Sequence, residues 1–309
     1  RPIWERLREE GSGSMEIVFQ TMANGLLVGA LYGLVALGFA LLMGVMKFLN
    51  TAHGTFIILG GYLSYWLLEL WGIDPFLSLP LVVMAMFLVG IAFYKLALSP
   101  LLKLPNIGMR INTSMLITFG SIWVLDNTMT VLWTPDVRSI MTSYTGQTLK
   151  LLGIRFSLTG LGGVGVAVLV ALALYFILSG TYFGKHIRAA TQDAVAASLC
   201  GINVQRTYLF SCGIAIALAG VAGMVVVSSY SISSTAGIGW LSSAFVVMVL
   251  AGEGNINAII PAGMLLGLIE SAGLLVVGVS YRQAIALIVF IIVLMIKPQG
   301  LFVKKEYSS

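Results

Sequence analysis

Charged residues are scarce in this 309-residue chain: Lys, Arg, Asp and Glu together make up 9% of it, whereas 59% of the residues are hydrophobic. A soluble domain carries about a quarter charged residues, so this composition does not supply a water-facing surface. Apolar runs of roughly 18 residues or more recur along the chain, as they do in membrane-spanning helices. The sequence therefore predicts an all-α fold, a polytopic transmembrane helical bundle, and excludes nucleic-acid-binding, collagen-like and disulfide-scaffold proteins.

Residue types that carry catalysis or bind metals are equally sparse. Cys200 and Cys212 form no CxxC pair, and His53 and His186 lie in different loops without a Cys, Asp or Glu at metal-ligand spacing. We expect two small buried thiols, no catalytic residue, no metal and no cofactor. Because the phosphate-binding pattern GxxxxGK[ST] is absent, ATP hydrolysis by this chain in the manner of a P-loop protein is excluded as well.

Residues 1–14 differ in character from the rest of the chain. Six of the first ten residues are charged, and a GSGS linker precedes Met15. This pattern is typical of an expression tag, so we expect a single transmembrane domain over 15–309.

Within that domain we expect about eight spans, or nine segments if one is broken or re-entrant. The predicted segments are 17–46, 55–71, about 80–98, 113–133, 158–178, 207–228, 240–279 and 283–296. The segment 240–279 is split at Gly252–Asn257, which is the best candidate for a broken helix. Glycines at helix-face spacing elsewhere favour close packing between helices.

Basic residues indicate the orientation of the chain. Lys and Arg are biased to the cytoplasmic loops of helical membrane proteins. Here they fall at segment ends that alternate consistently if all are cytoplasmic: Lys47, Lys103, Arg110, Lys185, Arg188, Arg206, Lys297, Lys304 and Lys305. The sequence thus predicts a cytoplasmic C-terminus and a native N-terminus on the outside.

Polar residues in or beside the apolar segments are candidates for a pathway across the membrane. Placing a charge in hydrocarbon costs roughly 2.5–3.5 kcal/mol on insertion scales, so each carboxylate is either functional or held by hydrogen bonds within the fold. Since no basic residue lies deep in a predicted span, we expect these acids to lack charge partners. The candidate pathway residues are Asn50, His53, Asp126, Asn127, Glu253, Asn255 and Glu270.

The stretch Gly184–Asn203 is the most specific feature. Its Ala, Lys, Arg and Gln residues favour a helix, and it is too polar and too short to span a membrane. We expect one cytoplasmic helix with small alanines on its apolar face. A helix that only rests on lipid headgroups prefers larger apolar residues, so docking against another protein is favoured over a solvated loop helix.

Several motifs occur in one order along the chain. They are NGLLVGALYGLVALGFALLMGV (24–45), NTAHG (50–54), GxxxRAA (184–190), GINV (201–204), LAGVAG (218–223), AFVVMVLAGEGN (244–255), GMLLGLIES (263–271) and KPQGLF (297–302). On these motifs the chain resembles the permease subunits of branched-chain amino acid ABC importers, in particular the first of the two paralogous permeases, from about residue 24 to 302.

The resemblance implies a permease that forms the translocation pathway for branched-chain or other hydrophobic amino acids. It implies several partners: a second homologous permease, two cytoplasmic ATP-binding cassette ATPases, an extracytoplasmic amino-acid-binding protein and the lipid bilayer, with no nucleic acid. It places the protein in a bacterial or archaeal cytoplasmic membrane. It also makes 184–203 the coupling helix, with ATPase contacts at Gly184, Arg188, Ala189, Asp193, Ala197, Gly201 and Asn203.

Some positions depart from the family pattern, among them Thr51, Ala251 and Glu253. They lie near the expected pathway, so related substrates such as urea, short amides or aromatic acids stay open. Whether the second permease is a paralogue or an identical copy is open too. The alternative classes are an ion-coupled secondary transporter, with Asp126 and Glu270 as coupling groups, and a channel built on the glycine-rich helices.

Overall fold

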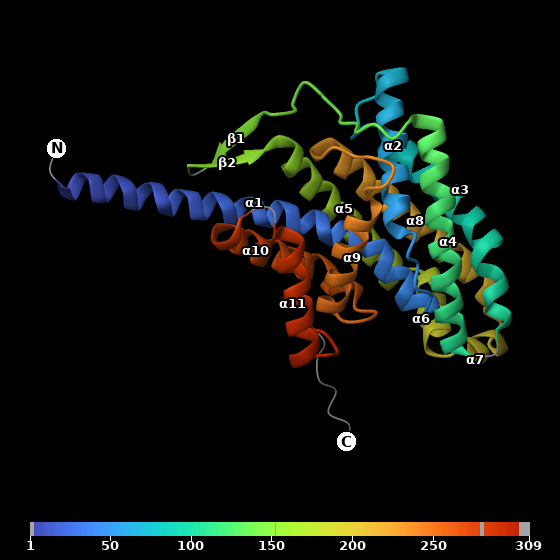
Figure 1. Ribbon diagram of the computed structural model, residues 1–309. Helices are drawn as coiled ribbons and strands as arrows, with labels where there is room; N and C mark the ends of the chain where they lie inside the picture. The colour runs from blue at the N-terminus through green and yellow to red at the C-terminus, as the bar shows by residue number, and fades with distance from the viewer. Residues whose placement is uncertain (1–2, 105, 152, 279–280, 303–309) are drawn as a thin grey trace.

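A computed structural model describes residues 3–104, 106–151, 153–278 and 281–302 (Figure 1). Its α-helices are α1 (Ile3–Met46), α2 (His53–Trp71), α3 (Leu79–Phe93), α4 (Ile107–Trp133), α5 (Leu158–Gly180), α6 (Tyr182–Gln192), α7 (Ala194–Leu199), α8 (Val204–Ser229), α9 (Gly237–Ala251), α10 (Ile259–Val277) and α11 (Arg282–Ile296). Two strands, β1 (Thr148–Leu151) and β2 (Ile154–Ser157), precede α5. Shorter helical turns follow α3 at Tyr94–Leu98 and Ser99–Lys103, and Ile256–Ala258 leads into α10.

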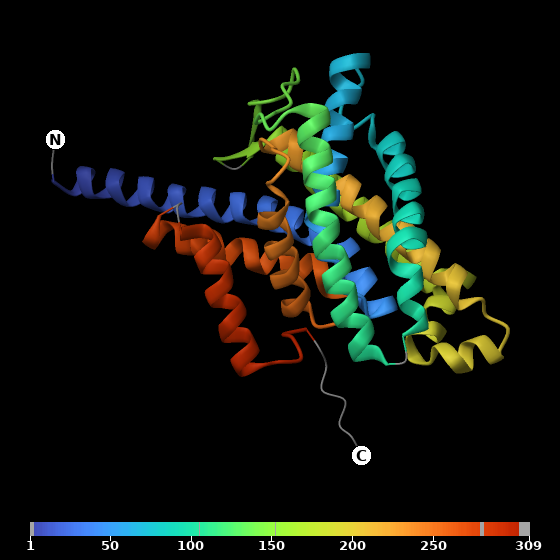
Figure 2. The ribbon, with the colours of Figure 1, turned by 45° about the vertical axis from the view of Figure 1, so that its right-hand side comes forward.

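Helices α1 and α8 form the centre of the bundle. The apolar stretch of α1 is 78% buried and that of α8 is 89% buried, against 11% for α4 and 17% for α5. A helix that is apolar on all sides has to be surrounded by other helices or by lipid. The structure thus has two core helices, whereas α4 and α5 are only slightly enclosed by the rest of the bundle, and Figure 2 shows α4 in front of the other helices.

Glycines let the helix backbones touch. A Cβ atom added at Gly29 of α1 would lie 2.6 Å from the carbonyl oxygen of Gly263 in α10, and one added at Gly33 would lie 2.9 Å from Cα of Ile260. Without a hydrophobic drive between helices in lipid, such close backbone contact is the main source of packing energy. The glycine spacing in α1 therefore serves packing, and α1 runs unbroken to Met46.

Within the described residues, six helical stretches are long and apolar enough to cross a membrane: 16–46, 79–102, 108–133, 158–180, 204–229 and 256–275. Three further segments predicted to span form helices that do not meet this measure, namely α2, α9 and α11. The break predicted in 240–279 is present, because α9 ends at Ala251 and a turn joins it to α10. The coarse prediction of a polytopic helical protein is confirmed, whereas the number of spans stays a prediction.

The prediction of an all-α chain misses one element. Residues 134–157, which lie between two predicted spans, contain the antiparallel hairpin β1–β2, with Lys150 opposite Arg155. The side chain of Gln20 in α1 pairs with the backbone of Arg155, since its Oε1 accepts from the Arg155 N–H at 2.8 Å and its Nε2 donates to the Arg155 carbonyl at 2.6 Å. A glycine at the turn, Gly153, takes a φ of +86°.

The two ends of the bundle carry different elements. The hairpin β1–β2 lies at one end, and α6 and α7 lie at the other, in both Figure 1 and Figure 2. The helix α1 begins at Ile3, inside the segment 1–14, and the assignment of that segment as a tag stays a prediction. Of the two cysteines, Cys212 is buried as expected, but Cys200 is exposed.

Candidate functional site

A cavity of about 380 Å³ lies among α1, α9, α10 and α11. Pockets of this size hold small molecules, with mostly apolar walls and a few polar groups that orient the ligand. The walls are formed by Val28, Tyr32, Tyr230, Gly239, Trp240, Ser242, Ser243, Val246, Glu270, Arg282, Gln283, Ala286 and Leu287.

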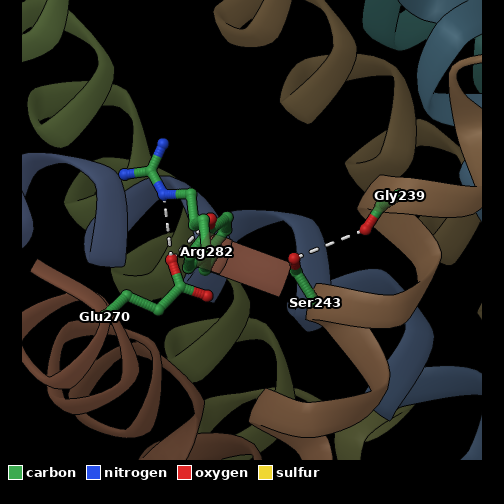
Figure 3. A network of polar contacts seen from close by, with 5 residues as sticks. Gly239, Ser243, Glu270 and Arg282 are labelled. Atoms are coloured by element: carbon green, nitrogen blue, oxygen red, sulfur yellow. Dashed lines mark hydrogen bonds and ion pairs between the residues drawn. The ribbon is translucent and has the colours of Figure 1, made fainter. Parts of the chain in front are cut away.

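An ion pair with a tyrosine sits in this cavity (Figure 3). The Nε atom of Arg282 donates to Oε2 of Glu270 at 3.2 Å, and the hydroxyl of Tyr32 donates to the same oxygen at 2.9 Å. The Glu270 side chain is 2% exposed, so an unpaired charge there would be costly. The three groups come from α11, α10 and α1, and each stabilises the others.

The ion pair corrects the expectation that the acids lack charge partners. Arg282 is the first residue of α11 and lies at the edge of the last apolar run, not deep within it. The chain turns back after α10, so that the start of α11 lies over Glu270. A pair separated by twelve residues across a turn between two helices has no fixed spacing in sequence, which is why Arg282 was missed.

A second, more apolar cavity of about 280 Å³ adjoins the first. The two share Ser242, Val246 and Leu287 as wall residues, so they form one groove between α9 and α11. The remaining walls of the second cavity are Phe39, Leu49, Thr51, Leu241, Phe245 and Phe290. We call the two cavities together the α9–α11 groove.

Helix α4 holds the wall of this groove at Leu49 and Thr51. The hydroxyl of Thr118 lies 2.8 Å from that of Thr51, and it also accepts from the Thr51 backbone N–H at 3.1 Å. The Leu49 N–H donates to the hydroxyl of Ser114 at 3.2 Å. Thr51, expected from the sequence to depart from the family pattern, thus lies in the wall of the groove.

A second ion pair lies at the end of the bundle where α1 finishes. Lys47 Nζ and Glu253 Oε1 are 2.7 Å apart, with side chains 40% and 50% exposed. The amide of Asn255, in the same turn between α9 and α10, donates to the carbonyls of Ala251 at 3.4 Å and Phe302 at 3.2 Å. Glu253 therefore also has a charge partner, contrary to the expectation from sequence, and it does not line the groove.

Asn50 and His53 are fully buried and form no part of the groove walls. His53 Nε2 lies 3.0 Å from the carbonyl oxygen of Val35, and Asn50 Oδ1 accepts from the N–H of Ala52 at 3.1 Å. Within the described residues, Nδ1 of His53 and Nδ2 of Asn50 have no hydrogen-bond partner. Both side chains fix the segment that leads from α1 into α2.

Asp126 and Asn127 lie on α4, away from the α9–α11 groove. Asn127 is exposed, and its amide donates to the carbonyl of Trp123 in the same helix at 2.7 Å. Asp126 is half-buried, and its Oδ1 has no hydrogen-bond partner among the described residues. Of the seven candidate pathway residues, only Glu270 lines a wall of the groove.

The stretch 184–203 forms two helices where one was predicted. The backbone at Asp193 is extended, with φ −153° and ψ 107°, and separates α6 from α7. Its carboxylate accepts from the N–H groups of Val195 at 2.8 Å and Ala196 at 3.0 Å. Capping of this kind favours a new helix start over continuation of the first one, so the prediction of a single helix is wrong.

The predicted coupling residues fall into two groups. Gly184 and Ala197 are buried and Ala189 is half-buried, so they hold α6 and α7 against the rest of the bundle. The others are exposed: Arg188, Asp193, Gly201 and Asn203.

Two of the exposed residues shape the end of α7 and the start of α8. Gly201 takes a φ of +84° in the turn after α7, and Asn203 caps α8 by accepting from the Arg206 N–H at 3.0 Å. Two large apolar side chains on α7 are exposed: Leu199, at 84%, belongs to the apolar face expected from the sequence, and Val195, at 70%, was missed.

The chain is similar to known permeases over almost its whole length. The family described as "Branched-chain amino acid transport system / permease component" matches residues 21–294. The high-affinity branched-chain amino acid transport system permease protein BraD of Pseudomonas aeruginosa is 28% identical over 302 residues, which cover 94% of this chain and 97% of that protein. The probable branched-chain amino acid transport permease protein LivH of Methanocaldococcus jannaschii is 31% identical over 284 residues and 87% of each chain. No solved structure gives a significant match.

A third relative extends the comparison beyond amino acid permeases. The ribose import permease protein RbsC of Haemophilus influenzae is 27% identical over 149 residues, or 46% of each chain.

Proposed function

The chain belongs to the family of branched-chain amino acid transport system permease components, and from this we propose that it forms the translocation pathway for branched-chain or other hydrophobic amino acids. The observation that carries the proposal in the structure is the α9–α11 groove. It combines apolar walls with one ion pair whose carboxylate is buried, as a small molecule with an apolar side chain and polar ends requires.

Energy for transport comes, in this proposal, from two partner ATPases. The alanines expected to make this contact are buried or half-buried against the bundle, as at Ala197. The exposed side chains of Val195 and Leu199 on α7 instead support an interaction surface at this end of the bundle, since exposed large apolar side chains are typical of sites that contact another protein or a membrane, and we assign it to the ATPases. A second homologous permease and an extracytoplasmic binding protein complete the proposed complex.

We further propose that α6, α7 and the C-terminus lie on the cytoplasmic side of the inner membrane. The carboxyl end of α1 with Lys47, the start of α4 and the carboxyl end of α11 gather at the same end as α6 and α7 in Figures 1 and 2. This clustering of helix ends that carry basic residues supports the orientation. The hairpin β1–β2 then faces outward, and α2, α9 and α11 cross as short helices.

At the outward end, the loop before the hairpin is anchored to the rest of the bundle. Arg138 fixes the loop before the hairpin, since its guanidinium donates to the Trp133 carbonyl at 3.0 Å and lies 5.4 Å from the ring centroids of Tyr65 and Trp66. Its backbone also pairs with Ile232, between α8 and α9. The outer surface is therefore held to the core at a defined place.

The experiment that tests the proposed function is uptake of radiolabelled leucine into proteoliposomes that contain both permeases and the ATPases, with the binding protein added outside. Uptake should require ATP inside the vesicles and this chain in the complex. Uptake without any ATPase that collapses with an ionophore would instead indicate an ion-coupled transporter, and conductance from this chain alone would indicate a channel. Urea, short amides and aromatic acids serve as competing substrates in the same assay.

A further inference from the structure

We propose that Arg282 and Glu270 bind the α-carboxylate and the α-ammonium group of a zwitterionic amino acid within the first cavity of the α9–α11 groove. This inference rests on the proposed function and assigns the site through which the substrate passes.

The ion pair in this cavity joins one nitrogen of the Arg282 guanidinium to one oxygen of the Glu270 carboxylate. Arg282 approaches Glu270 through Nε alone, and Figure 3 shows its two Nη nitrogens pointing away from that carboxylate. A guanidinium has five N–H donors, and its closed pairs with carboxylates are typically bidentate. The Nη side of Arg282 is therefore left for other partners, among them the hydroxyl of Tyr230, which lines the same cavity and shares a hydrogen bond with Arg282.

Glu270 is open in the complementary way. Its Oε2 atom takes both hydrogen bonds, from Tyr32 and from Arg282, and Oε1 accepts none from the described residues. Both Glu270 and Arg282 line the cavity. A carboxylate oxygen without a hydrogen bond from the described residues lies beside a guanidinium whose further partner is the neutral Tyr230 hydroxyl. Opposite charges thus face one small volume, which matches a zwitterion better than a cation or an anion.

The rest of the cavity matches an apolar side chain. Val28, Trp240, Val246 and Leu287 line it, and the second cavity continues past Val246 and Leu287 between further apolar residues. The volume of about 380 Å³ admits a molecule of the size of leucine. The Lys47–Glu253 pair does not offer such a site, because both side chains are about half exposed and neither lines a cavity of the groove.

Binding at this site should be weak. Arg282 and Glu270 already attract each other in the absence of a ligand, and the charged groups of the ligand have to compete with this attraction. We therefore expect a dissociation constant on the order of millimolar. Weak binding suits a site of passage, since tight capture would slow release. Transport assays alone would therefore reflect the binding protein more than this site, and a direct probe of the cavity is needed.

The test is protection of an introduced cysteine at Ser243, which lines the cavity. The reporter is Ser243→Cys with exposed Cys200→Ser, and Cys212 is buried. The whole complex is placed in phosphatidylglycerol nanodiscs without binding protein, and the rate of alkylation by a small water-soluble maleimide is measured. Leucine at twice its dissociation constant should slow the reaction about threefold.

Two analogues separate the contributions of the charges. Leucinamide lacks the carboxylate and 4-methylpentanoate lacks the ammonium group, so neither should protect at the concentration of leucine that does. Adding Arg282→Gln should abolish protection by leucine, whereas Lys95→Gln, at an exposed lysine on the helical turn after α3, should preserve it. Because the analogue series leaves the ion pair intact, it holds even where Arg282→Gln fails to assemble.

Three results would overturn the inference. Equal protection by leucine and both analogues would make the cavity a purely apolar site, and no protection by leucine would make the ion pair a structural clamp. Slow alkylation without leucine in phosphatidylethanolamine nanodiscs would assign the site to a zwitterionic lipid headgroup. If uptake requires the chain while protection is absent, only this inference fails; if removing the chain leaves ATP-dependent uptake unchanged, the proposed function fails.

Discussion

Lys47 and Glu253 join the end of α1 to the turn between α9 and α10, with 2.7 Å between Nζ and Oε1. The turn also receives the C-terminal segment, because the Leu301 N–H donates to the Leu250 carbonyl at 2.8 Å. Three parts of the chain thus meet at one place.

The first prediction concerns the contribution of the Lys47–Glu253 ion pair to the free energy of unfolding. Because both side chains are about half exposed, Glu253→Lys should lower the free energy of unfolding by no more than about 1 kcal/mol. The charge swap Lys47→Glu with Glu253→Lys should recover most of that loss. A double-mutant cycle on thermal unfolding in detergent measures it, and a coupling energy of zero would show that the contact contributes nothing to stability.

The second prediction concerns backbone contact between α1 and α10. Gly29→Ala places a Cβ 2.6 Å from atoms of Gly263 and Met264, so it should destabilise the protein by about 1–3 kcal/mol through overpacking. Gly165→Ala in α5 is the matched control, since nothing lies within 4 Å of its added Cβ. There a helical alanine should instead gain about 0.5–1 kcal/mol. Equal melting temperatures for both variants would refute the role of close packing.

The third prediction concerns docking of the ATPases. Leu199→Asp puts a charge on an 84% exposed apolar position of α7, and should reduce co-purification of the ATPases at least about tenfold, as expected for an anchor residue. Thr148→Asp introduces the same charge on β1, at the opposite end of the bundle, and should leave co-purification unchanged. Full retention of the ATPases by Leu199→Asp would place the docking surface elsewhere.

The fourth prediction concerns pH and the loop before the hairpin. The Tyr144 hydroxyl donates to Asp74 Oδ2 at 2.8 Å, and burial together with this hydrogen bond raises the pKa of Tyr144 to about 12. A raised pKa means that the contact stabilises the fold below pH 10, the ordinary pKa of tyrosine, and is lost as the pH rises through about 12. In an ultraviolet titration of tyrosinate, Tyr144→Phe should reduce the absorbance change near pH 12 by the contribution of one tyrosine. Removing the exposed Tyr182 of α6 with Tyr182→Phe should keep it.

The helices could largely be predicted from the sequence, because long apolar runs have few alternatives in a membrane. The two corrections in the secondary structure arise from short local signals. Asp193 interrupts an otherwise helical stretch with a capping side chain, and its interruption depends on whether the carboxylate turns back to the N–H of Val195 or outward to solvent. The hairpin is marked by apolar and polar alternation around Gly153, a weak signal in a stretch of eight strand residues.

The groove was harder to predict from the sequence than the helices were. Glu270 stood out because a carboxylate within an apolar run is costly, but Arg282 lies at a helix start, where a basic residue is ordinary. Their contact depends on how the chain turns between α10 and α11. The walls contributed by Ser242 and Val246 carry no signal of their own, since each resembles many other residues of membrane helices.

Because little of α4 is buried, we expect the position of this helix to depend on the thickness of the membrane. Its apolar stretch of 26 residues corresponds to a length of about 39 Å, against a hydrocarbon layer of about 30 Å. A helix longer than the hydrocarbon layer accommodates the difference by tilting, and α4 has few contacts with other helices that would oppose a change of tilt. Thr118 and Ser114 lie on the same helix and form hydrogen bonds with Thr51 and Leu49 in the groove wall. Acyl chain length therefore becomes a variable that acts on the width of the groove.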